Sequence, residues 1–183
     1  RQEYDLREQI GLTYAAWAKY REAVKWLQGV LERSQNVYRL ARIWYLIGQT
    51  HRLAGDTESA TEAFTQAVNG DPRPGYAYAA LVELVDAGIP VNEFQRGLID
   101  YYAGSHGAAV DAFYRYMEAT PGYDSDAHYY AALSYFQSGS YALAALECQR
   151  AIDAFPSTIP HWGELWLTRG RALARQELTD DAV

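Results

Sequence analysis

One stretch of the chain, residues 44–72, limits the fold more than any other, because it places small, aromatic and turn-forming residues at fixed spacings. In order, it contains Trp44, Ile47, Gly48, His51, Gly55, Ala60, Phe64, Ala67 and Pro72. Spacings of three and four residues bring side chains onto one face of an α-helix. Gly55 permits a turn with positive φ, and Pro72 ends the second helix because its nitrogen carries no hydrogen. The stretch predicts two antiparallel helices that cross closely at Gly48, with Phe64 beside the crossing.

The same spacing recurs before and after this stretch. A looser upstream copy, with Gln35 at the proline position, contains Ile10, Gly11, Tyr14, Tyr20, Ala23 and Leu27. Two downstream copies contain Gly97, Gly104, Ala109, Phe113 and Pro121, then Ala132, Tyr135, Gly139, Tyr141, Ala144, Cys148, Ala151 and Pro156. A last copy opens with Trp166, Gly170 and Leu173 and reaches Ala182. Internal repeats of this length indicate a stack of supersecondary units that bury a continuous core together.

The pattern resembles the tetratricopeptide repeat, which reads W-x2-L-G-x2-Y, then A-x3-F, then P, over about 34 residues. The resemblance implies an all-α fold: a right-handed superhelical solenoid of antiparallel helix hairpins, in a single domain over residues 1–183. Repeats are expected near 4–37, 41–74, 90–123, 125–158 and, truncated, 163–183, with an extra unpaired helix at 75–87. We expect ten helices and the start of an eleventh, near 3–17, 20–33, 37–54, 57–69, 75–87, 91–103, 106–119, 125–138, 141–154 and 161–176.

Composition and charge exclude several classes of function. Apolar residues make up 49% of the chain and charged residues 21%, so the chain can bury a core. The net charge is -7 and no basic run occurs, which argues against binding to nucleic acid or to anionic membrane surfaces. No apolar run approaches the roughly 18–20 residues that a membrane helix needs.

The ends of the chain and its cysteine content leave the compartment open. The chain begins at Arg1 and ends inside its last predicted repeat, so we expect a fragment of a longer protein. A single cysteine fits the cytoplasm, and it fits equally a cell-envelope protein that avoids thiols. Nearly all the basic residues are arginine rather than lysine, and alanine is abundant. This composition is typical of a GC-rich, bacterial genome.

The search for catalytic chemistry predicts no enzyme activity, no cofactor and no metal site. No phosphate-binding loop, dinucleotide fingerprint, zinc-protease motif or nucleophile elbow occurs. His51, His106 and His128 stand at aromatic packing positions of the repeat, and His161 follows a proline at a predicted helix start. Cys148 replaces the second-helix phenylalanine, which is a buried position where a thiol is inert.

The carboxylates are predicted to be structural as well. Asp124 and Asp126 flank a helix start, and Asp180 and Asp181 stand at the start of the truncated last helix, where acidic side chains favour the helix dipole. The remaining acidic residues of interest are expected on solvated faces: Glu32, Glu58, Glu62, Glu118 and Glu147.

Resemblance to the family implies that a protein or peptide binds along the concave face, which the first helix of each hairpin lines. The periodicity of these helices places twelve candidate residues on that face: Arg42, Tyr45, Gln49, Arg52, Phe94, Tyr101, Tyr102, Tyr129, Tyr130, Gln137, Arg171 and Arg175. Tyrosine is favoured at binding hot spots, although repeat proteins also use it in packing. The clamp that some family members use for chaperone tails is absent, because Glu8 and Leu12 occupy its positions. The chain is therefore predicted to be a non-catalytic protein-binding scaffold.

Two alternatives remain at this stage. Residues 75–176, and the run Arg96–Phe113 in particular, resemble the superhelical region of bacterial soluble lytic murein transglycosylases. That resemblance implies a non-catalytic arm of a cell-wall enzyme in the cell envelope, with peptidoglycan as a partner. The second alternative is a structural repeat that self-assembles through the exposed edges of the solenoid.

Overall fold

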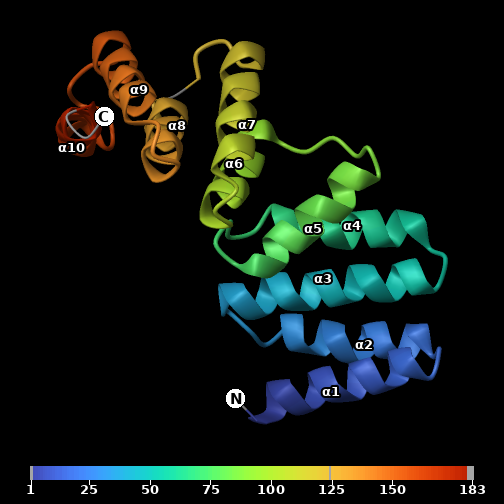
Figure 1. Ribbon diagram of the computed structural model, residues 1–183. Coiled ribbons are helices and arrows are strands. Elements are labelled where there is room, and N and C mark those ends of the chain that lie inside the picture. Colours follow the sequence, from blue (N-terminus) through green and yellow to red (C-terminus); the bar gives the residue numbers. More distant parts are fainter. Residues whose placement is uncertain (1, 124, 181–183) are drawn as a thin grey trace. The chain divides into compact units, whose positions relative to one another are not determined.

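In the computed structural model, residues 2–123 and 125–180 are described, and within them the chain forms ten α-helices and no strand (Figure 1). The chain divides into two compact units, residues 1–91 and 92–183. The helices of unit 1 are α1 (Gln2–Ala16), α2 (Tyr20–Leu31), α3 (Val37–Leu53), α4 (Thr57–Val68) and α5 (Gly75–Asp86). Those of unit 2 are α6 (Glu93–Tyr102), α7 (His106–Ala119), α8 (Asp126–Gln137), α9 (Tyr141–Ala154) and α10 (Trp162–Asp180).

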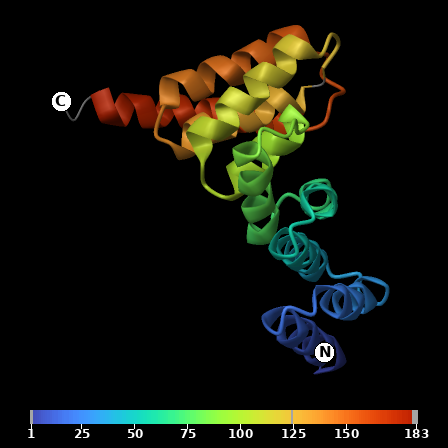
Figure 2. The ribbon, with the colours of Figure 1, turned by 90° about the vertical axis from the view of Figure 1, so that its right-hand side faces the viewer.

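Neighbouring helices pack as hairpins, which is the packing of a tetratricopeptide-like repeat solenoid. The hairpins are α1/α2 and α3/α4 in unit 1, and α6/α7 and α8/α9 in unit 2. The extra helix predicted at 75–87 is α5, which packs against α4 and α3. In unit 2, α10 packs against α9 and α8, and Figure 2 shows these three helices side by side.

Each hairpin closes on a small residue of its first helix. A Cβ added to Gly48 would lie 2.5 Å from the Phe64 ring, and one added to Gly97 would lie 2.5 Å from the Phe113 ring. At Gly11 the same atom would lie 2.9 Å from Leu27. The glycines are therefore required for the close approach of the two helices, as the spacing predicted.

The turns of the hairpins share one backbone conformation. Seven residues after each small crossing residue stands a residue with positive φ: Ala18, Gly55, Gly104 and Gly139, with φ between 57° and 81°. This conformation costs glycine little, whereas Ala18 adopts it in spite of its Cβ. Side-chain caps begin several helices, since Asn36 accepts a hydrogen bond from the backbone N–H of Arg39 and Asp56 from that of Ser59.

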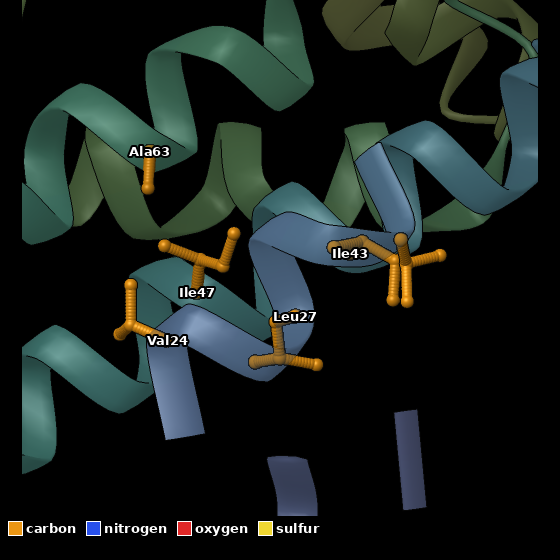
Figure 3. Close-up of a cluster of buried hydrophobic side chains, with 6 residues drawn as sticks. Val24, Leu27, Ile43, Ile47 and Ala63 are labelled. Atoms are coloured by element: carbon orange, nitrogen blue, oxygen red, sulfur yellow. The ribbon is translucent and has the colours of Figure 1, made fainter. Parts of the chain in front are cut away.

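The core of unit 1 lies between its hairpins. Val24 and Leu27 of α2 meet Ile43 and Ile47 of α3 and Ala63 of α4, and all five are buried (Figure 3). Burial of branched aliphatic side chains is worth about 1.5–3 kcal/mol each, so this cluster ties the first hairpin to the second.

The predicted helix boundaries agree with the structure within two residues in nine of the ten helices. The exception is α10, which was predicted to end at 176 and continues to Asp180. Part of the sequence expectation cannot be compared with the structure, because Asp124, Asp181, Ala182 and Val183 lie outside the described residues.

Candidate functional site

The twelve predicted binding residues lie on α3, α6, α8 and α10, and residues of α1 and α5 contact those of α3. We call the polar residues of α1, α3 and α5 that contact one another the unit 1 face. They are Glu8, Arg42, Tyr45, Gln49, Arg52, Tyr76 and Glu83. The corresponding surface of α6, α8 and the residue just before α10 is the unit 2 face, which comprises Tyr101, Tyr102, Tyr129, Tyr130 and His161.

The unit 1 face is held together by ion pairs and hydrogen bonds. Arg42 Nη2 lies 2.5 Å from Oε1 of Glu8, which is itself buried. Gln49 Nε2 donates to Glu83 Oε1 over 2.7 Å, and Arg52 Nη1 donates to Glu83 Oε2 over 2.6 Å. The predicted residues of α3 do come together, and the contacts that they make run largely to α1 and α5.

Beside these contacts, unit 1 contains a hollow of about 620 Å³. The rings of Tyr45 and Tyr76 lie 5.7 Å apart in its wall, and the Arg42 guanidinium lies 5.6 Å from the centroid of Tyr76. Its lining mixes both signs of charge with aromatic rings: Asp5, Glu8, Asn36, Tyr38, Arg39, Arg42, Tyr45, Pro74, Gly75, Tyr76 and Ala79. A short peptide segment fits such a hollow in size and chemistry.

The unit 2 face is aromatic. The four tyrosines that the sequence singled out do gather there, from two helices. Tyr130 lies at the centre, with ring centroids 5.5 Å from Tyr101, 6.5 Å from Tyr102 and 5.2 Å from Tyr129. Most of these ring pairs meet edge to face, a favourable arrangement for aromatic quadrupoles. Tyr102 is 43% exposed and the others are half-buried, so part of the cluster is open to solvent.

His161 belongs to this cluster, and the sequence analysis missed it. Its ring stacks on Tyr129 with the centroids 4.2 Å apart and the planes 4° from parallel. Its φ of 61° is rare for a residue with a side chain, and it places the ring next to the tyrosines just before α10 begins. Residues in such conformations often occur at functional sites. The sequence placed His161 at a helix start, but that position alone does not show which way the ring points.

The hydroxyls of Tyr101, Tyr129 and Tyr130 remain protonated donors near neutral pH, because burial raises the pKa of each. Burial raises the pKa of Tyr129, and the carboxylates of Glu164 and Asp126 add to the shift. Burial also raises the pKa of Tyr130, followed by a hydrogen bond with Tyr102. The hydroxyls therefore offer hydrogen bonds without a charge of their own.

The remaining predicted residues are not in the tyrosine cluster. Phe94 packs inside its hairpin, with its ring 5.7 Å from Phe113 and 5.1 Å from Tyr116. Gln137, Arg171 and Arg175 are exposed on α8 and α10.

A buried polar network lies between α7, α8 and α9, and it corrects one prediction. Glu147, expected on a solvated face, is only 1% exposed. Its carboxylate accepts hydrogen bonds from Tyr114, from Arg150 and from His128 Nδ1, the last over 2.8 Å. His128 Nε2 in turn lies 3.1 Å from the hydroxyl of Tyr123. The prediction for Glu147 is wrong because Tyr114 of α7 and His128 of α8 both reach its carboxylate, which lies buried between them.

The network keeps Glu147 ionised. Burial opposes the charge, but the hydrogen bonds from His128 and Tyr114 and the charge of Arg150 outweigh it, and the pKa of Glu147 is lowered. A buried carboxylate that three side chains contact in this way is a structural anchor.

A second buried carboxylate, Asp100 of α6, was also not singled out from the sequence. Burial raises its pKa to about 6, although the positive charges of Arg96 and Arg115 work in the opposite direction. Arg96 Nε lies 3.7 Å from the nearer carboxylate oxygen, which is too long for a hydrogen bond. Asp100 therefore reduces stability when it is ionised.

The other groups considered for chemistry occupy packing positions. Cys148 is fully buried against Ala132, Ala151 and Leu165, and burial raises its pKa to about 12. Across the described residues, no group of three or more His, Cys, Asp or Glu side chains is arranged to hold a metal ion. Over the same residues, no helix is both long and apolar enough to cross a bilayer.

Stacked antiparallel hairpins that close on a glycine define a helical-repeat protein. Two tetratricopeptide repeat models match the chain, over residues 41–73 and 94–158, which together span just over half of it. The chain belongs to the tetratricopeptide repeat family. Repeats of this family generally mediate protein–protein interactions and are typically non-catalytic. No curated protein matches the chain. Neither family match concerns murein transglycosylases, so that resemblance stays a prediction.

Proposed function

We propose that this protein is a non-catalytic scaffold that binds an extended polypeptide along its first helices, with the unit 2 face as the main contact. The tyrosine cluster is the observation that carries the proposal. Four tyrosines and one histidine form a continuous aromatic surface, and protein recognition sites are enriched in tyrosine.

The chemistry of this face suits a peptide backbone. Tyrosine offers a large rigid ring at a low cost in side-chain entropy, and its hydroxyl donates to a backbone carbonyl. Because the rings already contact one another, peptide binding costs little side-chain entropy at this face. The unit 1 hollow supplies a second, more polar contact for the same class of ligand.

The proposal is tested with a peptide selected from a random library on the purified chain. The variant that combines Tyr129→Ala with Tyr130→Ala should raise the Kd of that peptide at least about 30-fold, as expected for a hot spot of about 2 kcal/mol. Circular dichroism checks that this variant keeps its helices. The matched control is Tyr14→Ala, which removes a ring that packs on Trp17 at the end of α1 and should leave the Kd unchanged.

Two outcomes count against the proposal. An unchanged Kd in the double variant would remove the unit 2 face as the binding site. Selection of no peptide, together with co-sedimentation of the chain with purified peptidoglycan, would favour the role as an arm of a cell-wall enzyme.

A further inference from the structure

Arginines of unit 1 show how this chain combines an aromatic ring with a carboxylate. The Arg42 guanidinium lies 5.6 Å from the centroid of Tyr76, and its Nη2 lies 2.5 Å from Oε1 of Glu8. A guanidinium is attracted to the negative face of a ring and also to a carboxylate, so the two together favour a cation between them. Two further sets have the same composition: Arg7 with Trp26 and Glu3, and Arg39 with Tyr4 and Asp5.

The unit 2 face has the rings and the carboxylates of such a set. Its four tyrosines contact one another, with ring centroids between 5.1 and 6.5 Å apart. Two acidic residues stand near them, Asp126 in the first turn of α8 and Glu164 in the first turn of α10. Asp126 Oδ1 lies 4.0 Å from Nε2 of His161, whose ring stacks on Tyr129.

The two carboxylates make the electrostatic potential at this face negative. Burial is the main cause of the raised pKa of Tyr129, and the charges of Glu164 and Asp126 add to it. After burial and a hydrogen bond with Tyr102, the charge of Asp126 also contributes to the raised pKa of Tyr130. Both carboxylates lie in the first turn of a helix, where the helix dipole favours the ionised form. The face therefore attracts a positive charge.

No arginine or lysine of the described residues takes the place at these rings that arginine has in unit 1. The cation–π contacts found in the described part of the chain involve rings other than the four tyrosines. On α10, Arg169 lies 5.8 Å from the centroid of Trp166, and Arg171 follows Glu164 by seven residues, about 10 Å of helix. His161 is charged only when it is protonated.

We infer that the unit 2 face binds a basic side chain of the polypeptide ligand, arginine in preference to lysine. The inference rests on the proposed function and names the chemistry of the segment that is bound. Arginine is favoured because its planar guanidinium stacks on aromatic rings and is more weakly hydrated than an ammonium group. The net charge of -7 helps to attract a basic segment to the chain.

Two small probes test this preference for a cation: the N-acetyl amides of arginine and of citrulline. Citrulline has nearly the same shape as arginine and carries no charge. Each probe is titrated at pH 8.5, where a histidine is uncharged, and binding is followed by the NMR signals of the tyrosine rings. The Kd of the arginine probe should be at least about fivefold lower than that of the citrulline probe. The difference should decrease at high salt, and the N-acetyl amide of lysine should have an intermediate Kd.

Substitutions on the face locate the preference. The variant that combines Tyr129→Ala with Tyr130→Ala should bind the arginine and citrulline probes equally. Glu164→Gln removes one charge from an exposed side chain; it should raise the Kd of the arginine probe about threefold and leave that of the citrulline probe unchanged. The matched control is Glu177→Gln, which changes the net charge equally at an exposed position about 20 Å further along α10. It should leave both Kd values unchanged.

Equal Kd values for the two probes on the unmodified chain would overturn the inference. A preference for arginine that the double tyrosine variant retains would overturn it as well, because the cation would then bind elsewhere. The proposed function is judged separately, by the peptide selected from the library. If that peptide loses affinity in the double tyrosine variant while the two probes bind alike, the scaffold role stands and the preference for a basic side chain is wrong.

Discussion

The same repeat positions are filled by different chemistry in the two units. Four residues after the crossing glycine, α3 carries Arg52, whereas α6 carries Tyr101. In unit 1 these positions form ion pairs with neighbouring helices, such as Arg52 with Glu83. In unit 2 they form a layer of rings, such as Tyr101 against Tyr130.

The difference indicates that the unit 1 face mainly holds helices together, whereas the unit 2 face is available to bind a ligand. Polar side chains on the unit 1 face pair with one another, and a ligand would have to displace those contacts. The rings of unit 2 pack on one another and remain partly exposed, so a ligand adds contacts there and displaces few ion pairs. We therefore assign most of the affinity for a polypeptide to unit 2.

The largest loss of stability should follow from the same kind of substitution in both units. Phe64→Ala and Phe113→Ala each empty the space beside a crossing glycine, and each should lower the free energy of unfolding by about 3–5 kcal/mol, measured by urea denaturation. Equal losses mean that both hairpins close in the same way and that the faces differ only in their surface chemistry. A loss below about 1 kcal/mol in either variant would contradict the close packing at its glycine.

A slightly smaller loss of stability is expected in unit 2, at the buried network around Glu147. Glu147→Gln should lower stability by about 2–3 kcal/mol at neutral pH, because it removes charged hydrogen bonds to buried partners. Since the pKa of Glu147 is lowered on folding, its contribution is present above the usual 4.5 and is lost as the pH falls through the folded value. Urea titrations at several acidic pH values should therefore show less loss of stability in the variant than in the parent. Identical pH profiles would contradict the network.

Replacement of Asp100 should raise the free energy of unfolding, whereas the substitutions above should lower it. Its pKa rises from 3.8 to about 6 on folding, so the folded chain binds a proton more tightly and stability increases as the pH falls from about 6 to about 4. Asp100→Asn should stabilise the chain by about 2 kcal/mol at pH 7 and remove that pH dependence. Thermal unfolding of both chains at pH 7 and at about pH 4 measures the difference; a destabilised variant at pH 7 would show that Asp100 is needed as an ion.

The smallest effect should come from the ion pairs of the unit 1 face. Glu83→Ala removes the acceptor of both Gln49 and Arg52, yet these groups are partly exposed and solvent replaces the contacts. We expect a loss of about 0.5–1 kcal/mol by urea denaturation, falling at high salt. Asp86→Ala, one turn further along the exposed side of α5, serves as the control. A loss as large as that of Phe64→Ala would mean that unit 1 is held together by this face.

Most of the fold could be predicted from the sequence, because hairpin geometry depends on local spacing. The crossing at Gly48, the turn at Gly55 and the buried position of Cys148 all follow from residues within one repeat. The end of α10 could not be predicted in the same way, because position 177 is glutamate, whereas a glycine with positive φ follows α3, α6 and α8.

The candidate site was predicted only in part. Helical periodicity predicted that Tyr101, Tyr102, Tyr129 and Tyr130 lie on one side of their helices, and in the structure their rings lie close together. His161 could not be added, because its place depends on a backbone angle and on contact with the preceding hairpin. The burial of Glu147 depends on α7, which lies outside its own hairpin, and no periodicity within α9 signals it.

The most direct test of this account compares the two faces in one binding experiment. The selected peptide is titrated into the Tyr129→Ala, Tyr130→Ala variant and into a variant that combines Arg52→Ala with Glu83→Ala. The account predicts a loss of affinity of at least about 30-fold in the unit 2 variant and less than about threefold in the unit 1 variant. The reverse order, with the larger loss in unit 1, would contradict the assignment of recognition to the tyrosine cluster.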